Sequence, residues 1–157
     1  MRRLTMRTLA VGMMLVAVGM AGAATPEELG QQIGAVYVRC LEDVTALMEG
    51  LPPAAELQPE VAELRDACIE DLVELGRARQ GLDTPQNATV NAEVGSAMRR
   101  VPGELFQAFS DRQFHYQTSG DPDLAKMIAD FNVITQYADF ELLKTQSPKE
   151  AERLGIE

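Results

Sequence analysis

The sequence predicts an all-α protein, built as an up-and-down bundle of about four helices. Apolar residues recur at steps of three and four along most of the chain, and no strand-like alternation follows residue 23. The only two cysteines also suit a cross-linked helical hairpin. Residues 24–157 are numerous enough for a single helical domain with its own core and too few for two domains.

The first hairpin is predicted from two apolar series separated by a turn. The first series is Leu29, Ile33, Val36, Cys40, Val44, Leu47 and Leu51, and the second is Leu57, Val61, Leu64, Cys68, Leu72 and Leu75. Pro52 and Pro53 cannot continue the first helix, and Pro59 suits the first turn of the second. The two helices are therefore expected to lie antiparallel.

The two cysteines are expected to face each other across this hairpin. Cys40 lies 14 residues before Ala54, the centre of the turn, and Cys68 lies 14 residues after it. The C-x-x-C spacing of a redox pair is absent, and the acidic residues beside each cysteine disfavour a reactive thiolate. The sequence therefore predicts a structural Cys40–Cys68 disulfide. It closes a loop of 28 residues and contributes about 3.5 kcal/mol in the chain-entropy model.

The first 23 residues have the features of a cleavable secretory signal peptide. Arg2, Arg3 and Arg7 form a basic start, and an apolar run follows over residues 9–21. A membrane anchor is the alternative, but a bilayer needs about 20 apolar residues and this run is shorter. Cleavage is expected near Ala23, which predicts a periplasmic or secreted protein with no membrane insertion after signal removal. The paired arginines leave Sec and twin-arginine export both open.

The part of the chain expected after cleavage is strongly acidic. The sequence has 14 Lys and Arg, three of them in the leader, against 24 Asp and Glu, so residues 24–157 carry a net charge near −13. Such a surface repels nucleic acid and acidic lipid headgroups. The charge therefore excludes nucleic acid as a partner and is typical of a well-hydrated exported protein.

The second half of the chain is predicted to cover the apolar residues that lie beside the hairpin seam. Helical spacing runs from Val90 to about Gln117 with an interruption at Pro102, so we expect two short helices or one kinked helix. Asp121 and the proline after it are expected to start a long helix that reaches about Thr145. The predicted inner face of that helix is Leu124, Met127, Ile128, Phe131, Ile134, Ala138 and Leu142.

One helical face of the second half carries a candidate metal or small-ligand site. Glu104, Asp111 and His115, the only histidine of the chain, share this face if the segment is helical. A carboxylate beside an imidazole orients the ring and raises its basicity, as in metal and proton-transfer sites. The alternative is a surface histidine among solvated carboxylates.

No motif for a catalytic centre or a cofactor is found in the sequence. Covalent haem attachment needs C-x-x-C-H, and a di-iron bundle needs two Glu-x-x-His motifs, whereas this chain has one histidine. Nucleophile elbows, phosphate loops and paired zinc motifs are also absent from the sequence. We therefore predict no catalytic residue and no cofactor, and a non-enzymatic protein is favoured over an enzyme.

An aromatic stretch beside the Pro102 break is a candidate partner contact. It contains Phe106, Phe109, Phe114 and Tyr116, for which burial in the core is the alternative. The leading hypothesis is an exported, non-enzymatic helical bundle that contacts an unidentified protein partner in the cell envelope or outside the cell. The alternative hypothesis is a metal or small-ligand carrier that uses the face of Glu104, Asp111 and His115.

Overall fold

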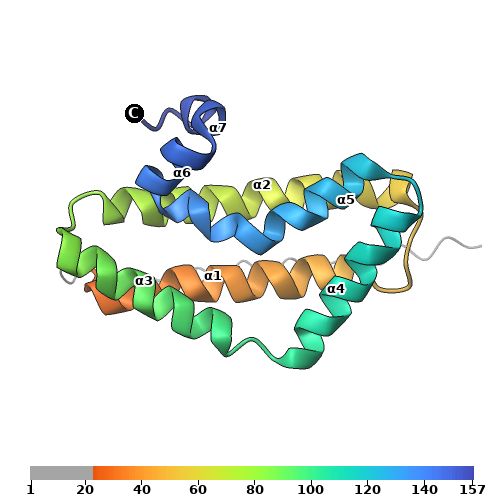
Figure 1. Ribbon diagram of the computed structural model, residues 1–157, viewed down its shortest axis with the longest axis horizontal. Coiled ribbons are helices and arrows are strands. Elements are labelled where there is room, and N and C mark those ends of the chain that lie inside the picture. The colour runs from red at the N-terminus through yellow and green to blue at the C-terminus, as the bar shows by residue number, and fades with distance from the viewer. Residues whose placement is uncertain (1–22) are drawn as a thin grey trace, which may run out of the picture.

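The computed structural model describes residues 23–157, which Figure 1 shows as helices joined by short connections. The elements are α1 (Pro26–Leu47), α2 (Ala54–Arg79), α3 (Thr84–Arg99), α4 (Gly103–Thr118), α5 (Pro122–Ala129), the 3-10 helix η1 (Asp130–Ala138), α6 (Phe140–Gln146) and α7 (Pro148–Arg153). The predicted all-α class is confirmed for this part of the chain. The predicted count of about four helices is not confirmed, because residues 23–157 contain seven α-helices.

The predicted signal peptide lies outside the described residues, apart from Ala23. From Ala23 to the C-terminus, no helix is both long and apolar enough to cross a membrane.

Two long helices, α1 and α2, form the centre of the molecule and lie antiparallel (Figure 1). α3 lies beside α1 and runs in the same direction, because Gly30 meets Val90 and Gly34 meets Ala97. α4 crosses towards the end of the hairpin where α1 joins α2, and α5 with η1 returns along α2. α6 and α7 form a small lobe that projects beside α2, near the end of α2 that leads to α3.

Side-chain caps explain where two of the helices begin. At the start of α1, the Thr25 hydroxyl accepts a bond from the Glu28 amide at 3.2 Å, and the Glu28 carboxylate accepts one from the Thr25 amide at 2.9 Å. Asp83 and Gln86 make the same reciprocal pair at the start of α3. Such capping boxes satisfy amide groups that have no partner inside the helix. Because Thr25 follows the predicted cleavage site, signal removal would leave the first cap intact.

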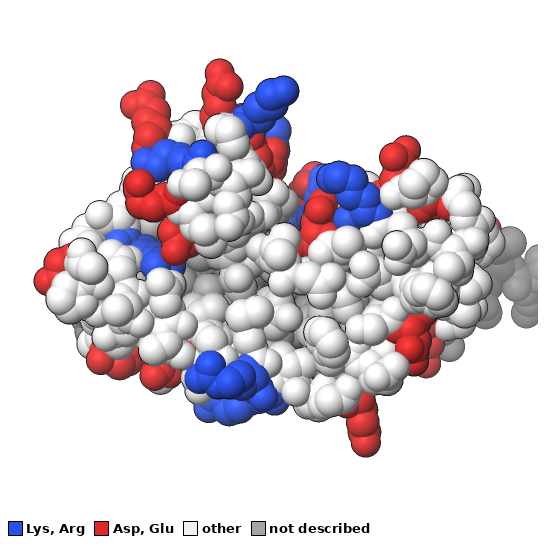
Figure 2. Space-filling view, viewed as in Figure 1, with Lys and Arg blue, Asp and Glu red and all other residues white. Residues whose placement is uncertain are grey.

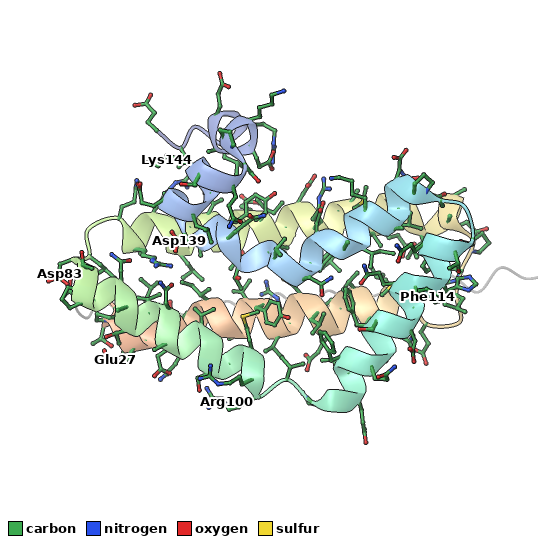
Figure 3. All side chains as sticks on the ribbon, in the orientation of Figure 1. Glu27, Asp83, Arg100, Phe114, Asp139 and Lys144 are labelled. Atoms are coloured by element: carbon green, nitrogen blue, oxygen red, sulfur yellow. A yellow bond between two sulfur atoms is a disulfide. The ribbon has the colours of Figure 1, made fainter. Side chains whose placement is uncertain are left out.

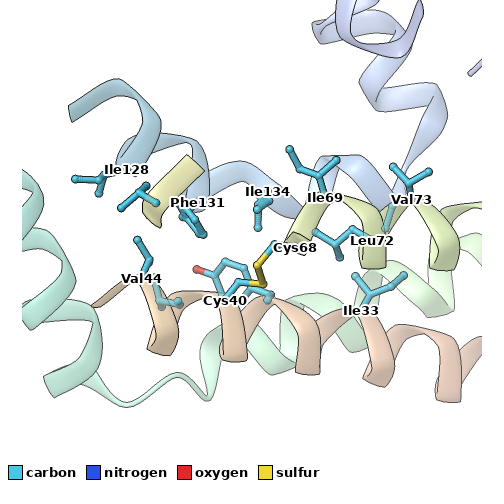
Figure 4. Close-up of a cluster of buried hydrophobic side chains, with 14 of the residues drawn as sticks. Ile33, Cys40, Val44, Cys68, Ile69, Leu72, Val73, Ile128, Phe131 and Ile134 are labelled. Atoms are coloured by element: carbon cyan, nitrogen blue, oxygen red, sulfur yellow. A yellow bond between two sulfur atoms is a disulfide. The ribbon is translucent and has the colours of Figure 1, made fainter. Parts of the chain in front are cut away.

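The predicted disulfide is confirmed, with Sγ atoms 2.07 Å apart and Cα atoms 6.3 Å apart. Figure 4 shows the sulfur pair surrounded by buried apolar side chains, among them Ile33, Leu72 and Ile134. Cys40 and Cys68 are 0% and 1% exposed. The link that joins α1 to α2 therefore lies inside the core.

The first helix ends earlier than the apolar series suggested. α1 stops at Leu47, and Gly50 and Leu51 adopt φ angles of +74° and +52°, which reverse the chain before Pro52. Leu51, the last residue of the first apolar series, is 42% exposed and lies in the turn rather than on the seam. A positive φ suits glycine and is uncommon for leucine, and the two prolines that follow restrict the chain further.

Three glycines allow helices to approach closely. A Cβ added at Gly34 would lie 2.4 Å from the Cβ of Ala97, and one added at Gly30 would lie 2.8 Å from the carbonyl oxygen of Val90. At Gly76, an added Cβ would meet the ring of Phe140 at 2.5 Å. The first two contacts bring α1 against α3, and the third brings α2 against the start of α6.

The predicted long helix over residues 121–145 is wrong in its second half. Asp121 caps α5 as expected, by accepting a bond from the Leu124 amide at 3.0 Å, but the α-helix ends at Ala129 and continues as η1. The β-branched run at residues 133–135 explains part of this change, because such side chains lose rotamer freedom in an α-helix. Asp139 then caps a new helix, α6, by accepting a bond from the Leu142 amide.

This restart changes which residues face the core. Leu142, predicted on the inner face, is 40% exposed, whereas Leu143 is fully buried. The other six predicted inner residues are buried or half-buried: Leu124, Met127, Ile128, Phe131, Ile134 and Ala138. The periodic pattern thus holds up to Ala138 and shifts by one residue after the break.

Candidate functional site

The candidate contact helix α4 is attached to the turn between α1 and α2. Phe109 and Tyr116 are 0% and 2% exposed, and the Tyr116 hydroxyl donates a hydrogen bond to the Pro52 carbonyl at 2.8 Å. The Arg112 guanidinium donates to the Thr45 carbonyl, which lies in the last turn of α1. A cation at that position also interacts favourably with the negative end of the helix dipole. One face of α4 is therefore fixed by packing and by two polar bonds.

Outside this fixed face, α4 carries two exposed aromatic rings. Phe106 is 50% exposed and Phe114 is 63% exposed, and Figure 3 labels Phe114 at the outer side of the helix. The two phenylalanines are eight residues apart on one ridge of the helix, with Ser110 between them, so their Cα atoms are separated by about 12 Å along the axis. We call Phe106, Ser110 and Phe114 the α4 ridge.

The predicted aromatic contact group is thus divided by the structure. Phe109 and Tyr116 belong to the core, whereas Phe106 and Phe114 remain open to solvent. Exposed single aromatics need no special explanation, but two of them on one fixed helix form a defined apolar feature.

The predicted ligand face of α4 is exposed along its whole length. Glu104, Asp111 and His115 are all exposed, and Asp111 accepts a hydrogen bond from the Gln107 amide at 2.7 Å. The His115 ring packs edge-on against Tyr116 with a centroid distance of 5.2 Å. Helical rise alone separates residues 104 and 115 by about 16 Å, so the three side chains do not converge on one point.

Within residues 23–157, no group of three or more His, Cys, Asp and Glu side chains is close enough to hold a metal ion. The carrier hypothesis therefore has no multi-ligand metal group in this part of the chain to support it.

One polar cluster that sequence reasoning missed surrounds Arg79. This arginine is 9% exposed and donates from Nε to Asn87 Oδ1 at 2.6 Å and from Nη2 to Asn91 Oδ1 at 2.9 Å. Nη2 also lies 3.1 Å from Asp139 Oδ2, so the guanidinium joins α2, α3 and the start of α6. The i, i+4 spacing of the two asparagines places them on one face of α3 and was the available sequence signal.

A second polar cluster joins α2, η1 and α7. Tyr137 donates to Glu150 Oε1 at 3.2 Å, and Arg153 holds Glu150 through bonds of 2.9 and 2.7 Å. Burial, followed by the charge and hydrogen bond of Glu150, raises the pKa of Tyr137 to about 12. The hydrogen bond from Arg153 lowers the pKa of Glu150 despite its partial burial. Arg65 adds a bridge to Asp130 at 3.3 Å.

Comparison with known proteins gives no relative for this chain. No protein family, curated protein or solved structure matches it.

Proposed function

We propose that this protein is an exported, non-enzymatic helical scaffold that acts through protein–protein contacts in the cell envelope or outside the cell, with the α4 ridge as its contact surface. One observation carries the proposal: Phe106 and Phe114 are 50% and 63% exposed on a helix that is fixed through Phe109 and Tyr116. A rigid aromatic pair binds with little loss of side-chain freedom, and aromatic residues often dominate binding energy at interfaces.

The surroundings of the ridge suggest the chemistry of the partner. Glu104 and Asp111 are exposed on the same helix, and neither forms a salt bridge within the described residues. The acidic net charge of residues 24–157 adds to this local charge. A partner groove with an apolar floor and a basic rim would complement both features, because charge complementarity raises association rates and selects partners.

In the same proposal the fold is a four-membered bundle in which two of the members are each interrupted and consist of two shorter helices. α3 and α4 follow one another past α1, and α5 and η1 continue one another along α2 (Figure 1). The breaks would allow α4 to leave the bundle direction and present its outer face. The buried disulfide supports this role, because it fixes the hairpin to which α4 is attached.

Site-specific photo-crosslinking in the native compartment tests the proposal. A photoreactive residue is placed at Phe106 or at Phe114, and for comparison at Val133, a 53% exposed apolar residue on η1. We expect one discrete adduct of the same mass from both α4 positions and none from Val133. Equal labelling at all three positions, or no discrete adduct from α4, would contradict the proposal.

A double substitution of Phe106 and Phe114 by serine gives the energetic test once the partner is purified. Loss of two central aromatic contacts is expected to weaken binding by at least about 2 kcal/mol, or about 30-fold. Val133→Ser is the matched control and is expected to bind as the unaltered protein does. Far-ultraviolet circular dichroism checks that all variants remain folded.

A further inference from the structure

A hollow of about 360 Å³ lies where α2, α3 and the start of α6 meet. Figure 2 shows basic atoms inside a recess on this side of the molecule, and Figure 3 labels Asp139 at the same junction. The volume is at the lower end of the range of about 300 to 1,000 Å³ found for ligand pockets. The hollow is separate from α4 and takes no part in the proposed protein contact.

Arg79 forms part of the wall of the hollow, and one of its three guanidinium nitrogens has no hydrogen-bond partner within residues 23–157. Its side chain is only 10% exposed, and its Nε and Nη2 atoms are bonded to Asn87, Asn91 and Asp139. Within residues 23–157, Nη1 has no hydrogen-bond partner, yet it is not among the fully enclosed unpaired atoms. Arg79 lines the hollow, and Nη1 is its one guanidinium nitrogen whose donor capacity is not used by residues 23–157.

Two further polar side chains of the wall are free to bond. The Gln80 amide and the Thr84 hydroxyl make no side-chain hydrogen bond to any residue from 23 to 157, and each can both donate and accept. Leu82 and Phe140 supply apolar surface beside them. The hollow therefore combines several unpaired polar groups with an apolar wall.

The charges of the hollow are already balanced by protein groups. Asp139 neutralises Arg79, and Glu141 is paired with Lys144 at 2.7 Å. An anionic ligand would lose hydration without gaining a net attraction, because Arg79 and Lys144 are already paired, and a cationic one would give Arg79 Nη1 no acceptor. A neutral ligand rich in hydroxyl groups meets neither difficulty, because a hydroxyl both donates and accepts.

We propose that this hollow binds a small neutral polyhydroxylated molecule of about monosaccharide size. One hydroxyl oxygen accepts from Arg79 Nη1, others bond to Gln80 and Thr84, and the less polar face of the molecule lies against Phe140. The buried arginine is held in place by its three protein partners, so the donor is oriented before the ligand arrives.

Titration of the disulfide-intact exported protein, followed by nuclear magnetic resonance, tests this proposal. The neutral probes are glucose and mannitol, and gluconate is the anionic probe of similar size. We expect at least one neutral probe to shift the Arg79 Nε–H signal and the amide signals of Gln80 and Thr84 saturably in the millimolar range. We expect gluconate to bind at least tenfold more weakly, because its carboxylate would lose hydration beside charges that are already paired.

The double variant Gln80→Ala/Thr84→Val removes two polar groups from exposed positions and leaves Arg79 intact. It is expected to weaken binding of the neutral probe about tenfold, as for two lost hydrogen bonds. Gln117→Ala/Thr118→Val makes the same chemical change on α4 and is expected to have no effect. Lack of any saturable shift with both neutral probes, equal or tighter binding of gluconate, or unchanged binding by the double variant would each overturn the proposal.

Discussion

Substitution of Gly34 by alanine tests the closest helix contact in the fold. The new Cβ would lie 2.4 Å from the Cβ of Ala97, where carbon atoms in contact normally keep about 3.5 to 4.0 Å, so α1 and α3 must move apart. Overpacking of this kind destabilises the folded state by about 1 to 3 kcal/mol, and the better helix propensity of alanine offsets up to about 1 kcal/mol of that loss. We expect a net loss of about 1 to 2 kcal/mol in the free energy of unfolding. For a domain of about 135 residues this lowers Tm by about 3 to 7 °C.

Chemical denaturation monitored by circular dichroism measures this loss, and two further variants make it specific. Ala97→Gly in the Gly34→Ala background removes the Cβ that the new alanine would meet. The double-mutant cycle is therefore expected to show a favourable coupling of about 1 kcal/mol between the two substitutions. Gly103→Ala is the matched control, because nothing lies within 4 Å of an added Cβ there. It is expected to be neutral or stabilising. If Gly34→Ala is as stable as the unaltered protein, or if the double variant shows no coupling, then α1 and α3 do not limit each other's approach at this contact.

Three further outcomes are expected. Reduction of the disulfide lowers the free energy of unfolding by about 3.5 kcal/mol and Tm by about 12 °C in thermal unfolding, because it releases a 28-residue loop in the unfolded chain. Arg79→Met lowers the free energy of unfolding, measured with denaturant, by about 2 kcal/mol, because it leaves Asp139 and two asparagines without their partner. The control Arg39→Met breaks an ion pair with Asp71 that is about half exposed, and it lowers the free energy of unfolding by less than about 0.5 kcal/mol. In an ultraviolet absorbance titration, Tyr137 ionises near pH 12 and Glu150→Gln lowers that value. Because the folded state holds this proton more strongly than the unfolded chain, the Tyr137 contribution to stability is complete below pH 10 and is lost as the pH rises towards 12.

The hairpin was predictable because its signals are local and agree with one another. The apolar spacing, the prolines of the turn and the two cysteines each indicate the same antiparallel pairing, and the disulfide confirms it. The end of α1 was harder to predict, because Leu51 matches the apolar spacing but takes a positive φ in the turn. Periodicity alone does not say where a helix stops.

The break after Ala138 depends on contacts between distant residues, which a single sequence does not reveal. Asp139 is held by Arg79 from α2, and Phe140 packs where Gly76 leaves room. These contacts restart the helix in a new phase and leave Leu142 exposed. Tertiary packing here overrides a continuous helical pattern.

The sequence predicts that the candidate site is helical, but it does not show which side chains of that helix are exposed. Phe109 and Tyr116 are seven residues apart and share one face, so helical spacing could have separated them from Phe114. Which face turns inward depends on the Tyr116 bond to Pro52 and the Arg112 bond to Thr45, both of which join residues more than 60 positions apart. In the Arg79 cluster only the ion pair with Asp139 joins distant residues, whereas the two asparagines lie 8 and 12 positions after Arg79 and could have been noticed from their spacing.

We propose that the chain is exported, and its first two helices are joined through Cys40 and Cys68. Intact-mass measurement of protein recovered from its native compartment, with and without reductant before alkylation, tests both points most directly. We expect a chain that begins near Ala24, is two hydrogens lighter than its reduced form, and takes up alkylating reagent at both cysteines only after reduction. A retained leader would contradict export, and two thiols that react without reductant would contradict the Cys40–Cys68 disulfide.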